Sequence, residues 1–140
     1  MNHESYSANY TTDILATVKV IALVGASANP ARPSFGVMKF LLGKGYNVIP
    51  VNPGLAGKEI LGQRVYASLS EIPRPFDMVD IFRNSNAVAD LVDQALNLAV
   101  KPKIIWMQLE VRNDEAAAKA EAAGLQVVMN RCPAIELHHN

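Results

Sequence analysis

The amino-acid sequence predicts an α/β fold, a doubly wound parallel sheet of five or six strands in a single domain. Short runs rich in Val, Ile and Leu alternate with amphipathic segments of helical period, as expected of repeated strand–helix units. Several of these runs are apolar throughout, which indicates strands covered on both faces. The length of 140 residues is typical of one domain.

The first predicted strand–helix unit runs from Lys19 to Gly45. An apolar run at 20–24 is expected to be the central strand, and it stops at Gly25. After a loop of small residues and prolines, apolar residues recur with helical spacing, so a helix is expected to begin near Ser34. Backbone N–H groups at such a loop and helix start bind an anion such as a phosphate. The alternative interpretation is that the small residues only make the turn.

The remaining elements follow in order along the chain. Strands are predicted at 46–51, 77–82, 103–107 and 125–129, with a short strand-like piece at 63–67. Helices are predicted as a short one from Asp13 to Ala16, a brief one opened by the capping box at 68–71, one with its apolar face between Val88 and Ala99, and one from an N-cap at Asn113 to Gly124. Residues 130–136 are expected to form a closing helical turn. Residues 1–12 are expected to be a poorly ordered arm, 13–137 the folded domain and 138–140 a tail.

Right-handed crossovers place the loops after four of these strands on one rim, at the carboxyl ends of the sheet. Ligand binding is predicted on that rim because polar residues follow these strands: Ser27, Arg32, Ser34, Asn52, Arg83, Asn84, Gln108 and Arg131.

The rim departs from the pattern of nicotinamide dinucleotide sites. The second and third glycines of G-x-G-x-x-G are replaced by Ser27 and Pro30, so the strict fingerprint is absent. The acidic residue that pairs with a ribose at the end of the second strand is also missing, because Val51, Asn52 and Pro53 stand there. A ribose that bears a phosphate would meet no repulsion, and Lys58 is within reach of it; the alternative is a solvated loop lysine.

Composition narrows the classes of partner and compartment. Thirteen basic and thirteen acidic residues cancel, which argues against a nucleic-acid-binding protein. The apolar runs are too short to cross a membrane and no signal peptide is recognisable, so a cytoplasmic protein is expected. The single cysteine, Cys132, excludes an intrachain disulfide, and the histidines lie only in the terminal segments, so no metal site is expected.

Five segments together resemble a known family: GASANPARPSFGVMKFLL, VIPVNP, VDIFRNS, WMQLEVRN and VVMNRCPAIE. They are similar to the small stand-alone CoA-binding proteins, which are related to the CoA-binding domain of the succinyl-CoA synthetase alpha subunit. The similarity spans about Asp13 to Leu137. It implies a Rossmann-like fold with coenzyme A or acyl-CoA as the ligand. It also implies Gly25, Ala26, Ser27, Arg32 and Ser34 at the phosphates, Asn52 and Pro53 beside the adenosine, and Phe82, Arg83 and Gln108 along the rest of the groove.

The chain departs from that family's pattern at two positions. Glu110 stands where glycine is usual and Asn130 where aspartate is usual. A carboxylate at Glu110 is expected to narrow the groove or to repel a phosphate. Ligase activity is not implied, because the phosphorylated histidine of the synthetase lies in a domain outside the similarity.

We therefore expect a non-catalytic binding module for CoA or acyl-CoA, acting as a carrier, a sensor or a subunit of a larger assembly, with a protein partner or homo-oligomer possible. The alternatives are a small nicotinamide-dependent oxidoreductase or CoA-dependent transferase, which would need an acid or base such as Glu110 or Cys132, and an interaction protein with an empty site. A mixed disulfide between Cys132 and the CoA thiol is a further hypothesis, set against an inert buried thiol.

Overall fold

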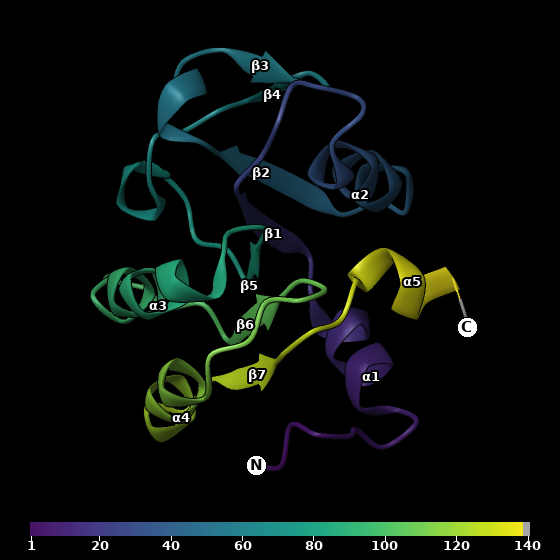
Figure 1. Ribbon diagram of the computed structural model, residues 1–140. Helices are drawn as coiled ribbons and strands as arrows, with labels where there is room; N and C mark the ends of the chain where they lie inside the picture. The colour runs from purple at the N-terminus through teal and green to yellow at the C-terminus, as the bar shows by residue number, and fades with distance from the viewer. Residues whose placement is uncertain (139–140) are drawn as a thin grey trace.

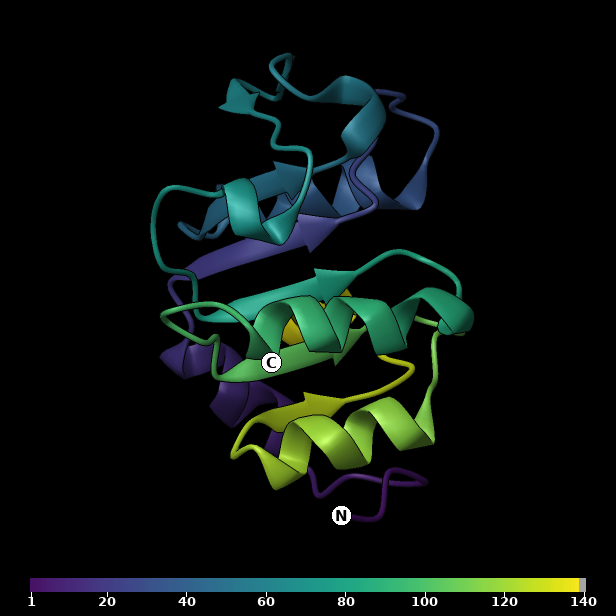
Figure 2. The ribbon, with the colours of Figure 1, turned by 90° about the vertical axis from the view of Figure 1, so that its left-hand side faces the viewer.

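The computed structural model describes residues 1–138, and the chain is built around a five-stranded parallel sheet (Figures 1 and 2). Its strand order is β2-β1-β5-β6-β7. The strands are β1 (Val20–Val24), β2 (Asn47–Val51), β5 (Met78–Ile81), β6 (Ile104–Met107) and β7 (Gln126–Val128). Every neighbouring pair is parallel, which confirms the predicted fold class. Of the predicted tail at 138–140, residues 139–140 lie outside the described residues.

The prediction that the first strand is central is wrong, because β5 holds the middle of the sheet. The chain moves outward from β1 to β2 and then returns to form β5 on the other side of β1. The loops after β1 and β5 therefore leave the sheet on either side of a topological switch point, where open α/β sheets bind ligands.

The strand-like piece at 63–67 belongs to a separate hairpin rather than to the main sheet. Strands β3 (Glu59–Ile60) and β4 (Gln63–Arg64) pair antiparallel, and they lie at the top of Figure 1. One isolated parallel bridge joins Tyr66 to Val51 at the end of β2. The hairpin therefore lies next to the edge strand β2, and Lys58 lies in the loop that leads into it.

Five helices cover the two faces of the sheet. They are α1 (Tyr10–Thr17), α2 (Pro33–Gly43), α3 (Val88–Leu96), α4 (Asp114–Ala122) and α5 (Pro133–His138). In Figure 1, α3 and α4 lie on one side of the sheet and α1, α2 and α5 on the other. Each side has its own apolar core, because successive strand residues point to opposite faces. Trp106 is fully buried on the α2 side, where its indole Nε1 donates to the carbonyl of Arg131 at 2.9 Å.

The helix boundaries follow local signals in the sequence. Pro33 opens α2, where its fixed φ suits the first helical position. The side chain of Asn113 accepts a hydrogen bond from the N–H of Ala116 at 3.0 Å, which confirms the expected N-cap of α4. Short 3-10 helices follow three strands: η1 (Pro53–Leu55), η2 (Leu69–Glu71) and η3 (Ser85–Ala87).

The N-terminal segment lies along β7, an edge strand of the sheet. The hydroxyl of Tyr10 donates to the carbonyl of Val127 at 2.8 Å, and the hydroxyl of Tyr6 accepts from the N–H of Met129 at 2.8 Å. His3 is buried and contacts both Tyr6 and Glu121. That residues 1–12 form a poorly ordered arm in solution stays a prediction. Within residues 1–138, no helix is long and apolar enough to cross a membrane.

Candidate functional site

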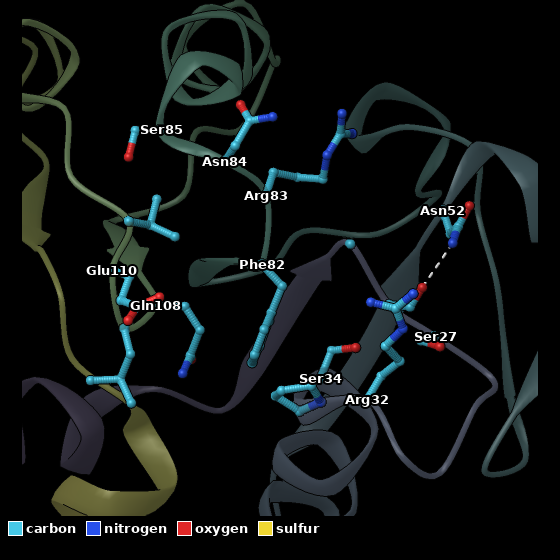
Figure 3. Close-up of a pocket in the computed structure, with 15 residues that line it drawn as sticks. Ser27, Arg32, Ser34, Asn52, Phe82, Arg83, Asn84, Ser85, Gln108 and Glu110 are labelled. Atoms are coloured by element: carbon cyan, nitrogen blue, oxygen red, sulfur yellow. Dashed lines mark hydrogen bonds between the residues drawn. The ribbon is translucent and has the colours of Figure 1, made fainter.

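A cavity of about 920 Å³ opens at the carboxyl ends of β1, β5 and β6. Its size is in the range of small-molecule sites. We call it the rim groove; it is lined by Gly25, Ala26, Ser27, Arg32, Pro33, Ser34, Asn52, Phe82, Arg83, Asn84, Ser85, Gln108, Leu109, Glu110 and Val111 (Figure 3). The groove spans the topological switch point between β1 and β5.

Nine of the eleven predicted site residues line this groove. They come from four loops that are far apart in sequence, so the structure brings together what the sequence analysis grouped on one rim. Pro53 and Lys58 are the two that do not line it, and neither does Arg131, which the sequence analysis also expects on the rim. Pro53 begins η1 and Lys58 lies in the loop before β3, and both are exposed. The role of each residue in binding stays a prediction.

The first strand ends at Gly25, whose φ is +88°. A Cβ on Gly25 would lie 2.5 Å from the carbonyl oxygen of Phe82, so any side chain there would force the β1 and β5 exits apart. Glycine is therefore required both by the backbone conformation and by this close approach. Because Gly25 has no side chain, the β1 and β5 exits come into contact there and form the floor of the groove.

Several N–H groups of the loop after β1 are used within the chain. Gly25 and Ala26 both donate to the carbonyl of Val51, at 3.1 and 3.3 Å. The N–H of Asn29 donates to Ser27 Oγ at 3.0 Å, and that of Arg32 to the carbonyl of Asn29. These N–H groups are therefore occupied within the chain, and the binding of a phosphate by the loop and the helix start stays a prediction.

The groups that remain available gather at the start of α2. Within residues 1–138, the N–H groups of Ser27 and Ser34 have no hydrogen-bond partner. The Ser34 hydroxyl also lacks a partner in this part of the chain, and Ser34 is buried while lining the groove. Ser27 Oγ accepts one bond, and its hydroxyl hydrogen can still donate. With the positive end of the α2 dipole, these donors favour an anion at this wall.

Two arginines add positive charge to the groove. Arg32 precedes α2 and Arg83 follows β5, and both are exposed at the groove. Neither guanidinium makes a hydrogen bond or an ion pair with any other described residue. Both are therefore free to pair with an anionic ligand, and guanidinium groups bind phosphates in bidentate geometry.

Asn52 ties two loops together at the β2 side of the groove. Its Nδ2 donates to the carbonyl of Ala26 at 2.8 Å, drawn as the dashed line in Figure 3, and its Oδ1 accepts from the N–H of Gly54 at 2.8 Å. The side-chain amide of Asn52 therefore joins the β1 exit to η1. The loop carries no carboxylate in the groove.

The opposite wall is formed by the exit of β6. Gln108 is 5% exposed, and neither atom of its terminal amide has a partner among residues 1–138; its Oε1 is fully buried. Glu110 is the one carboxylate among the residues that line the groove. Its φ is +69°, a left-handed conformation that favours glycine. Its N–H donates to Oδ1 of Asn130 at 2.7 Å, and Asn130 has a φ of +57°.

Beneath the groove, Asp80 lies in the middle of β5 with no exposed surface. It pairs in register with Leu23 and Trp106, so apolar residues flank it on both neighbouring strands. Neither carboxyl oxygen has a hydrogen-bond partner within the described chain. Burial raises the pKa of Asp80 well above its ordinary value of 3.8, because the charged form loses its hydration.

The sequence analysis left out four residues of the groove wall that the structure adds: Pro33, Ser85, Leu109 and Val111. Ser85 Oγ accepts from the N–H of Arg112 at 3.0 Å, which joins the β5 and β6 exits. Leu109 and Val111 could not be recognised as groove residues, because an apolar residue after a strand looks in the sequence like a residue of the core. Asn84 had been noted as polar and also caps η3.

Cys132 does not line the groove; it is buried in the core on the α2 side. No group of three His, Cys, Asp or Glu side chains that could hold a metal is found within residues 1–138.

The chain is similar to a known protein family and to several solved structures. Residues 19–138 match the family model described as a CoA binding domain. A protein of Bacillus subtilis (strain 168), uncharacterized protein YneT, is 36% identical over 120 residues, which are 86% of each chain. A solved structure of a hypothetical protein from Pyrococcus horikoshii OT3 has a TM-score of 0.88 at 39% identity, covering 96% of this chain and 92% of that one. The alpha subunit of ADP-forming acetate–CoA ligase I from Pyrococcus furiosus is 33% identical over 93 residues, 64% of this chain but 20% of that subunit.

Proposed function

The chain belongs to the CoA binding domain family, and on that premise we propose that its rim groove binds coenzyme A or an acyl-CoA. The observation that carries the proposal is the set of unpaired donors at the β1 and β5 exits. Ser34 offers its N–H and hydroxyl, and Arg32 and Arg83 offer guanidinium groups without a protein partner. These groups suit the diphosphate of the ligand.

The neighbouring strand supports CoA over a nicotinamide dinucleotide. The end of β2 holds Val51, Asn52 and Pro53, so no carboxylate is present to pair with ribose hydroxyls. We place the adenosine beside Asn52 and Pro53, and the ribose phosphate toward Lys58 on the hairpin side. The pantetheine arm then runs past Phe82 toward Gln108.

The lining also favours binding over catalysis. Within the described chain, the groove lining includes one carboxylate, that of Glu110, and no histidine, cysteine or lysine. Glu110 lies on the wall opposite Arg32 and Ser34 (Figure 3). Cys132 is buried outside the groove, which weakens the mixed-disulfide hypothesis and the transferase alternative. We therefore propose a carrier, a sensor or a subunit of a larger assembly. A cytoplasmic location stays a prediction from the sequence.

Calorimetric titration with CoA, dephospho-CoA, NAD and NADP tests the proposal. CoA is expected to bind most tightly, and dephospho-CoA to lose about 1–3 kcal/mol if a basic side chain pairs with the ribose phosphate. Lys58→Gln should remove that difference, whereas Lys101→Gln, an exposed lysine outside the groove, should keep it. NAD binding as tight as CoA binding would overturn the assignment.

A further inference from the structure

The rim groove is divided by charge along its length. In Figure 3, Arg32 and Ser27 lie on one side, Phe82 in the middle, and Gln108 and Glu110 on the other side. The strand order separates the two walls, because the first belongs to the β1 exit and the second to the β6 exit, with β5 between them. Two strand spacings amount to about 10 Å. A ligand that spans the groove therefore meets donors and cations at one end and the Glu110 carboxylate at the other.

The Glu110 end of the groove is held in place by the backbone. The N–H of Glu110 donates to Asn130 Oδ1 at 2.7 Å, which ties the exit of β6 to the exit of β7. This bond holds Glu110 in a left-handed conformation that is unfavourable for a residue with a side chain. The position of the Glu110 Cα at the rim is thus fixed, although its side chain is exposed.

The Glu110 carboxylate is not paired with a positive group of the described chain. It makes no ion pair and no hydrogen bond with any of residues 1–138. Its two neighbours along the chain, Leu109 and Val111, are apolar and also line the groove. The side chain of Leu109 is 48% exposed. Beside them, the terminal amide of Gln108 lacks a protein partner. This end therefore offers apolar surface, an unpaired amide and a negative charge.

We propose that this end of the groove, formed by Gln108, Leu109, Glu110 and Val111, seats the acyl group and selects it by charge. Neutral aliphatic acyl thioesters are accepted, and acyl groups that end in a carboxylate are rejected. The inference rests on the proposed function, because a ligand whose diphosphate lies at the start of α2 directs its pantetheine arm toward this end. Leu109 and Val111 supply contact for an aliphatic chain, and Glu110 repels a second carboxylate.

Butyryl-CoA and succinyl-CoA provide a matched pair of probes, because both acyl chains have four carbons and only the second ends in a carboxylate. We expect the intact protein to bind butyryl-CoA about tenfold more tightly than succinyl-CoA at low salt, a difference of about 1.4 kcal/mol. Raising the salt to about 0.5 M should reduce this ratio, because ions screen the exposed carboxylate.

Two variants separate the charge of Glu110 from general effects. Glu110→Gln keeps the size of the side chain and should bring the ratio of the two dissociation constants to within about twofold, because the repulsion is gone. Glu71→Gln removes an exposed glutamate outside the groove and should keep the ratio near its original value. Equal binding of the two thioesters by the intact protein, or an unchanged ratio in Glu110→Gln, overturns the inference and leaves CoA binding standing. Absence of binding by CoA and both thioesters overturns the proposed function itself.

Discussion

The carbonyl oxygen of Phe82 lies 2.5 Å from the point that a Cβ on Gly25 would occupy. The two residues end neighbouring strands, β1 and β5, on either side of the topological switch point. The N–H of Phe82 also donates to the carbonyl of Val24 at 2.8 Å, so the two exits are hydrogen-bonded as well as in contact. The floor of the groove is therefore a contact between two backbones, which leaves no room for a side chain.

Gly25→Ala is expected to lower the free energy of unfolding by about 2–4 kcal/mol, because it adds a clash with Phe82 to a left-handed backbone conformation. Urea denaturation followed by circular dichroism measures this change. The matched control is Gly36→Ala, since Gly36 lies in α2 with open space around it. That substitution should stabilise the protein by about 0.5–1 kcal/mol. Equal effects of the two substitutions would contradict the role of the close approach.

Glu110→Gly is expected to stabilise the protein by about 1 kcal/mol, because glycine adopts the φ of +69° without strain. Chemical denaturation at neutral pH gives the difference. Glu110→Ala removes the same carboxylate but keeps the Cβ, so it should give little gain. A similar gain in both variants would attribute the effect to charge rather than to the backbone.

Asp80→Asn is expected to stabilise the protein more at pH 8 than at pH 4.5, by about 1 kcal/mol or more. Burial raises the pKa of Asp80 in the folded state above 3.8, so the folded protein holds a proton that the unfolded chain releases as pH rises. The stability of the original protein therefore falls as pH rises through this window, and the asparagine removes that dependence. Thermal unfolding of both proteins across the pH range tests the sign; parallel curves would contradict it.

Arg32→Gln and Arg83→Gln are each expected to weaken CoA binding by about 1–2 kcal/mol, because each removes a guanidinium that has no partner within the described chain. The slope of affinity against salt concentration should also become shallower. Arg74→Gln is the control, since Arg74 is exposed outside the rim groove. Calorimetric titration gives both quantities. Loss of affinity in Arg74→Gln to the same extent would assign the effect to overall charge.

Much of the fold was predictable because it is encoded locally. The apolar runs of β1 and β6, the proline that opens α2 and the N-cap at Asn113 each act over a few neighbouring residues. The order of the strands was not predictable from local patterns. The side of β1 on which β5 pairs depends on the direction of a crossover. The same reason explains the segment at 63–67, which pairs with β3 in a hairpin instead of joining the sheet.

The candidate site was predictable to the extent that it follows from strand exits. Polar residues after parallel strands meet on one rim, and nine of the predicted residues line one cavity. Local sequence patterns could not show which backbone and side-chain groups form hydrogen bonds within the chain. The N–H groups of Gly25 and Ala26 are taken by Val51, and the amide of Asn52 is taken by Ala26 and Gly54. Those partners are distant in sequence or depend on the shape of the turn.

The two tyrosine hydroxyls that meet Val127 and Met129 also bear on how copies of this protein behave in concentrated solution. They occupy backbone groups at the end of the edge strand β7 and just after it, which a strand from another molecule could otherwise pair with. The N-terminal segment therefore covers this edge of the sheet. Its removal would expose the edge strand and favour association between molecules.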